Sequence, residues 1–180
     1  MEFIPENSQT ATVDIPYYDD VKVEDGWQGH TTAKSIATLK LEITLCLSRL
    51  GGMVLSFQQG KYIIGDKRRD GFQIHYTVEQ ANGLLHQGKL DIAALPVREN
   101  YRLQRTLQKR KDNSLKMALY MARKALEGTW FLQKLSPGYA PLMPWMLASN
   151  GKTITQLWSE QVFLENLLPS GEEFIEGEVV

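Results

Sequence analysis

The first candidate for chemistry is a segment with the residue types of a phosphate-binding loop. It reads Gly29-His30-Thr31-Thr32-Ala33-Lys34-Ser35, but such a loop needs glycine at the positions held by Gln28 and Ala33. Nucleotide hydrolysis is therefore not predicted. The free amides of a helix start at Thr31 or Thr32, beside Lys34, could still hold a phosphate. An ordinary helix cap is the commoner role for these residues.

Acids, histidines and the single cysteine form no pattern that indicates catalysis or metal binding. The set is His30, His75, His86, Cys46, Asp66, Asp70 and Asp91. No pair has the spacing of zinc ligands, and the aspartates, which could cluster as acids do in nucleases, follow no recognisable pattern. Cys46 lies among apolar residues and reads as a small buried side chain. The sequence predicts no catalytic residue, no cofactor and no metal.

Basic residues form a larger and more informative group, because their distribution along the chain is uneven. Residues 1–25 carry seven acids and one base, and residues 159–180 carry six acids and no base. Residues 26–158 carry nineteen bases against eight acids, which gives +11 under a whole-chain charge of -1. A strongly basic body favours binding to nucleic acid, because Lys and Arg neutralise phosphates and release condensed counterions.

The predicted phosphate contacts lie in one loop, one segment before a helix and one strand. They are Lys67, Arg68, Arg69, Lys89, Arg98, Arg102, Arg105, Lys109, Arg110 and Lys111. A run such as residues 109–111 is also the usual way to keep a surface solvated. A polar strand face with Gln73, His75, Thr77 and Lys89, together with Tyr62, Tyr101 or Tyr139 for stacking, favours single-stranded DNA or RNA with little sequence preference.

The elements that must position these residues follow from the apolar periodicity. Residues 32–50 repeat apolar side chains at helical spacing, with Thr31 or Thr32 as cap, and residues 53–64 read as one bent strand with a bulge or turn at 58–60. Residues 65–71 read as a loop. Strands are expected at 72–78, where apolar and polar residues alternate, and at 90–94, and these two should pair antiparallel.

The second half of the chain is predicted to be helical. A helix is expected over 114–135 with Asn113 or Ser114 as cap, a short turn at 142–148, and a third helix from the cap Thr153 to Leu167. The fold class is α+β, a three-stranded or larger antiparallel sheet with helices on one face, in the order helix-strand-strand-strand-helix-helix. That order is similar to the order in double-stranded-RNA-binding domains, and small sheet-plus-helix cores occur in single-strand annealing proteins. No functional residue is assigned from either.

Domain organisation and partners complete the predictions. We expect an acidic arm at 1–25, one domain at 26–168 and an acidic tail at 169–180 that resembles, in composition, the tails of bacterial single-strand-binding proteins. One cysteine and no apolar run long enough for a bilayer favour the cytoplasm and no membrane. The leading hypothesis is a non-enzymatic nucleic-acid-binding protein, with the tail as a possible protein contact and oligomers possible. A protein adaptor that docks an acidic partner is the alternative, and an enzyme ranks third.

Overall fold

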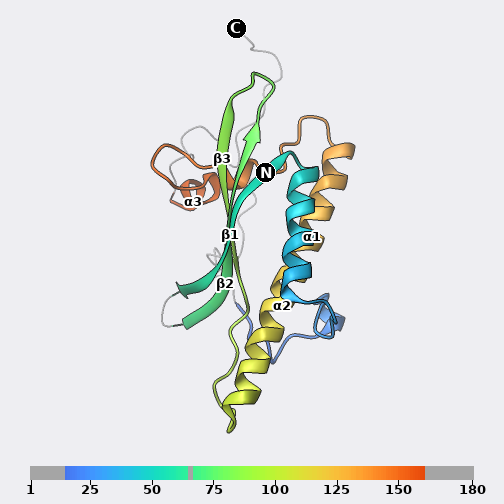
Figure 1. Cartoon of the computed structure of the whole chain (residues 1–180), viewed down its shortest axis with the longest axis vertical. Coiled ribbons are helices and arrows are strands. Elements are labelled where there is room, and N and C mark those ends of the chain that lie inside the picture. The colour runs from blue at the N-terminus through green and yellow to red at the C-terminus, as the bar shows by residue number, and fades with distance from the viewer. Residues whose placement is uncertain (1–14, 65–66, 161–180) are drawn as a thin grey trace, which may run out of the picture.

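A three-stranded antiparallel sheet and two long helices make up the fold of this computed structural model (Figure 1). The structure describes residues 15–64 and 67–160. The elements are α1 (Ile36–Arg49), β1 (Gly52–Ile64), β2 (Lys67–Glu79), β3 (Leu85–Ala93), α2 (Gln104–Leu135) and α3 (Ile154–Ser159), with short 3-10 turns η1 (Val23–Asp25) and η2 (Met143–Trp145). The predicted α+β class and order of elements are confirmed.

The core lies between one face of the sheet and the two long helices. Alternation along β2 directs Phe72, Ile74 and Tyr76 toward the helices, and all three are fully buried. They pack with apolar residues of α1 and α2, among them Leu39, Ile43, Leu47, Leu115, Leu119 and Leu126. Glu42 contacts Arg123 and Arg49 covers the ring of Trp130, so α1 and α2 run in the same direction.

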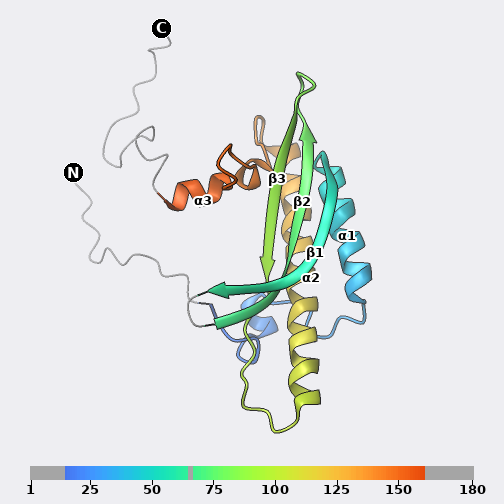
Figure 2. The same cartoon turned by 60° about the vertical axis from the view of Figure 1, so that its left-hand side comes forward.

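The far end of the β1–β2 hairpin bends, and glycine makes the bend possible. Gly60 pairs with Gly71 across the two strands. A Cβ on Gly71 would lie 2.3 Å from the carbonyl oxygen of Ile92 and 2.6 Å from Cε2 of Tyr62. The Tyr62 ring therefore lies directly over Gly71, and the hairpin turns out of line with β3 (Figure 2).

The outer edge of β1 is protected although it is long. A register shift between Val54 and Ser56 marks a bulge, and the Lys40 Nζ donates to the carbonyl oxygen of Phe57 at 3.3 Å. Bulges hinder pairing with further strands, and the contact from α1 engages one carbonyl of β1. The predicted single bent strand is confirmed (Figure 2). The predicted bulge or turn at 58–60 is wrong, because pairing continues through Gln58, Gln59 and Gly60 and the bulge lies nearer the start of the strand.

Two element boundaries differ from the prediction, and both change the element to which basic residues belong. β2 begins at Lys67, so the expected loop at 65–71 is strand from residue 67 onward. α2 begins at Gln104, ten residues before the predicted start at Ser114. Arg, Lys and Gln are good helix formers, and an exposed helical turn needs no apolar stripe. The basic segment before the helix is therefore largely its first turns.

Helix starts and the chain end give mixed outcomes. Thr153 caps α3 as predicted, accepting from the Gln156 backbone N–H at 3.2 Å, whereas the cap of α1 is Ser35 and not Thr31 or Thr32.

The segment between α2 and α3 contacts the sheet, because Met146 bridges to Gly88 on the outer edge of β3. The rest of the predicted third helix, residues 1–14 of the acidic arm, and the tail lie outside the described residues. Within the described part of the chain, no helix is long and apolar enough to cross a membrane.

Candidate nucleic-acid interface

Two adjoining hollows lie between the bent end of the hairpin and the chain before α2. The first, of about 640 Å³, is lined by Tyr17, Arg68 and residues 96–100. The second, of about 160 Å³, shares Arg68 and adds Lys61, Asp70 and Lys111 among its lining residues. We call this pair of hollows the basic groove, since its walls carry Lys61, Arg68, Arg98 and Lys111. Asp70 and Glu99 are the acids in the same walls.

Arg68 is the basic residue that lines both hollows, where the other shared residues are Pro96, Val97 and Glu99. Its side chain is exposed, as is that of Lys61, and neither has a hydrogen-bond or ion-pair partner among residues 15–64 and 67–160. Lys111 lies 3.8 Å from Glu99, an acid whose side chain is 78% exposed. Such a loose, solvated pair holds the lysine weakly. These three cations are therefore available to an anionic ligand.

Arg69, the neighbour of Arg68, is not available. Its Nε donates to the carbonyl oxygen of Ala94 at 2.7 Å and its Nη2 to that of Ala93 at 2.8 Å. Burial lowers the pKa of its guanidinium, although an arginine stays protonated. The predicted phosphate contact at Arg69 is therefore replaced by a structural role, the joining of the hairpin to the end of β3. Lys67, the first residue of β2, pairs with Ile64.

Two acids of the N-terminal segment hold Arg98 and Arg110. Asp19 accepts hydrogen bonds from the Tyr101 hydroxyl and from the Arg98 backbone N–H, and it lies 3.6 Å from Nε of Arg110. Asp20 pairs with the Arg98 guanidinium. We call this set the acidic clamp. Burial alone would raise the pKa of Asp19, but the Tyr101 and Arg98 hydrogen bonds and the charge of Arg110 outweigh it and lower the pKa.

The acidic clamp belongs to the folded body. Tyr18 is buried with 4% of its surface exposed, and its backbone N–H donates to the Pro96 carbonyl at 2.8 Å. The described end of the predicted acidic arm is therefore packed against the basic region. Pairing between acids and bases removes part of the positive charge that composition alone assigns to the body.

Helical geometry separates the consecutive bases Lys109, Arg110 and Lys111. Successive residues turn by about 100° around a helix, so Lys109 and Lys111 point about 200° apart. Lys111 faces the basic groove and Arg110 reaches the Tyr101 hydroxyl at 3.1 Å. Lys109 points elsewhere and is exposed, together with Arg105 one turn before it and Arg102 ahead of the helix. We call these last three residues the α2 basic stripe.

The polar face of the sheet is occupied by its own hydrogen bonds. Tyr62 donates its hydroxyl to Asp91 at 2.8 Å and Gln73 donates its amide to the same carboxylate at 3.0 Å. His75 is bonded to Gln73 at 3.0 Å, and Lys89 lies 3.5 Å from Asp91. Burial, and then Asp91, raises the pKa of Tyr62. The predicted contacts from Lys89 and Tyr62 are therefore engaged with Asp91, and neither residue lines the basic groove.

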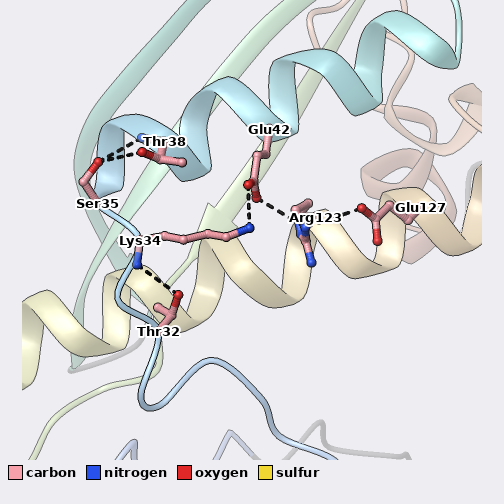
Figure 3. Close-up of polar contacts among 7 residues, drawn as sticks. All are labelled: Thr32, Lys34, Ser35, Thr38, Glu42, Arg123 and Glu127. Carbon is pink, nitrogen blue, oxygen red and sulfur yellow. Dashed lines mark hydrogen bonds and ion pairs between the residues drawn. The ribbon is translucent and has the colours of Figure 1, made fainter.

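The suspected phosphate loop is also occupied, as Figure 3 shows. Ser35 accepts from the Thr38 backbone N–H at 3.1 Å and caps α1. Lys34 donates to Glu42 at 2.5 Å, and the other Glu42 oxygen lies 3.3 Å from Nη1 of Arg123. This network ties the chain before α1 to both helices. Lys34 has an internal carboxylate in the place where a phosphate would sit.

The remaining chemical candidates do not assemble. Strand alternation places Asp70 with Phe72 on one face of β2, while Asp91 pairs with Gln73 on the other. Asp66 lies outside the described residues. Cys46 is buried, and burial raises the pKa of its thiol. Within the described ranges no three His, Cys, Asp or Glu side chains are grouped as they would be around a metal ion.

Sequence reasoning missed two lining residues of the basic groove, Lys61 and Tyr17. Lys61 lies inside a predicted strand, and only the pairing of Lys61 with Asp70 shows that it lies beside the basic end of β2. Tyr17 carries the guanidinium of Arg98 over its ring at 4.7 Å, a contact between positions far apart in the chain.

No family model, curated protein or solved structure matches this chain.

Proposed function

We propose that this protein binds nucleic acid through the basic groove and performs no chemistry on it. The observation that carries the proposal is the position of Arg68, exposed and without a described partner, on the border of both hollows. Lys61 and Lys111 flank it in the second hollow. Three available cations along one depression match the repeated charges of a phosphate backbone, whose neutralisation supplies most of the free energy of non-specific binding.

A single strand fits this groove better than a duplex. The larger hollow, of about 640 Å³, lies within the roughly 300–1,000 Å³ that encloses a drug-sized molecule. That space suits one or two nucleotides of a single strand, whereas a double helix is too wide to enter it and would reach the cations only from outside. Backbone-directed contacts with few base-reading groups favour DNA or RNA binding with little sequence preference. We also propose that the acidic termini lower the affinity, since Asp20 of the N-terminal segment already pairs with Arg98, a lining residue of the larger hollow.

Fluorescence anisotropy with labelled single- and double-stranded oligonucleotides across a salt series tests this proposal. We expect tighter binding of the single strand, and the double variant K61A/R68A should reduce the slope of log affinity against log salt by about 0.7 for each contact removed. The control is K134A in the last turn of α2, about 35 Å along the helix from Lys111. Absence of salt-sensitive binding at low ionic strength would refute the proposal.

A protein adaptor is the second candidate function, and one surface favours it. Leu41 and Leu45 on the outer side of α1 are 59% and 56% exposed. The two lie one helical turn apart and form an apolar strip of the kind that marks contact sites. If the oligonucleotides fail to bind, while the L41S/L45S variant changes the elution volume of the chain on size exclusion, the adaptor becomes the better assignment.

A further inference from the structure

The α2 basic stripe faces a different direction from the basic groove. Lys111 lines the groove, and Lys109 points about 200° away from it around the same helix. Arg105 precedes Lys109 by four residues, so the two side chains lie next to each other on one side of α2. A single short strand lying in the basic groove would therefore not contact this pair.

The side of α2 that carries the stripe is covered only further along the helix. Arg105 and Arg123 are eighteen residues apart, about five full turns, and so project in the same direction. At Arg123 this side contacts Glu42 of α1. At Arg105 it is open, because the first turns of α2 extend beyond the sheet and α1 in both views (Figures 1 and 2).

The three cations of the stripe are available in the same sense as Arg68. Arg102, Arg105 and Lys109 are exposed, and none has a hydrogen-bond or ion-pair partner in the described part of the chain. The acid on the same side of α2, Asp112, accepts a hydrogen bond from Gln108 at 3.0 Å. By contrast, Arg98 and Arg110 of the acidic clamp are held by Asp20 and Asp19. The stripe is a second basic surface, separated from the basic groove by the thickness of a helix.

We propose that the α2 basic stripe is a second phosphate-binding surface, so that one chain holds two separate segments of single-stranded nucleic acid. This inference rests on the proposed function of the basic groove. It adds that one chain binds two oligonucleotides instead of one and holds them close to each other. A chain with two such surfaces brings two strands together. Arg110 lies between Lys109 and Lys111 around the helix and pairs with Asp19, so a neutralised arginine separates the two surfaces on that side of α2.

The test mixes the full chain with a donor-labelled and an acceptor-labelled single-stranded oligonucleotide of about 20 nucleotides. We expect two oligonucleotides per chain at saturation and energy transfer between them. The variant R105A/K109A should bind one oligonucleotide with an affinity within about twofold of the original, because the two surfaces share no residue, and energy transfer should vanish. The variant K134A/K152A removes the same charge elsewhere and should retain transfer.

Other results of this experiment would contradict the second binding surface or the proposed function. Binding of one oligonucleotide per chain without transfer overturns the second surface and leaves the proposed function standing, whereas no binding at all refutes both. Light scattering on the bridged complex must show one chain; if only complexes of two chains give transfer, bridging comes from association and the inference fails. A further result is an R105A/K109A variant that keeps the energy transfer but no longer binds to a polyglutamate column. That result would identify the α2 basic stripe as a binding surface for an acidic protein and would overturn the inference.

Discussion

The acidic clamp and the basic groove hold side chains of the same type in opposite situations. In the clamp, Arg98 and Arg110 face carboxylates from a segment about 80 to 90 residues earlier in the chain. In the groove, Arg68 and Lys61 face solvent. The difference shows that the charge available to a ligand is set by tertiary partners. The net charge summed over residues 26–158 counts both kinds of cation equally. It therefore overstates the positive charge that is available to a phosphate.

The strongest test of this contrast compares neighbours in β2. Replacing Arg69 by Ala removes both donors from the carbonyls of Ala93 and Ala94 and should lower the free energy of unfolding by about 2–4 kcal/mol, because buried acceptors lose their partners. Urea unfolding measures this loss. Arg68→Ala is the matched control and should leave the unfolding midpoint unchanged. Equal effects at the two positions would contradict the division between structural and available arginines.

A smaller loss is expected from the clamp itself. Asp19→Asn keeps the shape of the side chain but removes the charge that Arg110 and the Tyr101 hydroxyl face, and should cost about 1–2 kcal/mol of unfolding free energy. Urea unfolding at neutral pH is again the measurement. Asp20→Asn, on an exposed pair, is the control. If both substitutions proved neutral, contacts other than these carboxylates, such as the buried Tyr18, would hold the N-terminal segment.

The same carboxylate makes part of the stability depend on pH. The pKa of Asp19 is lower in the folded chain than its ordinary value of 3.8, so its contribution is present above that value and is lost as pH falls through the folded pKa. The difference in unfolding free energy between the original chain and Asp19→Asn should therefore shrink from pH 6 to pH 3. A constant difference over this range would show that the charge of Asp19 is not the stabilising property.

The smallest expected effect is a gain. Asp20→Ala frees the guanidinium of Arg98, which lines the larger hollow, and should raise affinity for a single-stranded oligonucleotide by roughly two- to threefold at low salt. Anisotropy titration measures the change. Glu24→Ala in η1 removes an equal charge from the same segment and should raise the affinity less. Equal gains would mean that net charge alone matters and that the pairing with Arg98 does not.

Apolar patterning predicted the parts of the fold that face the core and missed the parts that do not. The alternation from Phe72 to Val78 identifies β2 because one side of the strand is buried. The first turns of α2 carry a single buried apolar residue, Leu107, so periodicity began only near Leu115. Likewise, residues 67–71 read as a loop because glycine and charged residues extend β2 beyond the core.

The site was predictable in composition and not in arrangement. Arg68, Lys111 and the α2 basic stripe were all among the predicted phosphate contacts, yet no pattern in the sequence separates Arg68 from Arg69, or Lys109 from Lys111. Those distinctions follow from strand alternation and helical rotation once the element boundaries are correct. The pairing of Asp19 with Arg110 joins positions 91 residues apart, and a single sequence carries no signal of such a contact.

The parallel course of α1 and α2 has a consequence for how a charged ligand approaches. Each helix carries the equivalent of about half a positive charge at its N-terminus, and because the two run in the same direction their macrodipoles add instead of cancelling. Ile36 and Gln104 open the helices toward the end of the molecule where the hairpin bends (Figure 1). The two helix N-termini therefore add partial positive charge at the end of the molecule that carries the basic groove, a contribution that is confined to the first turns and weakens as salt is added.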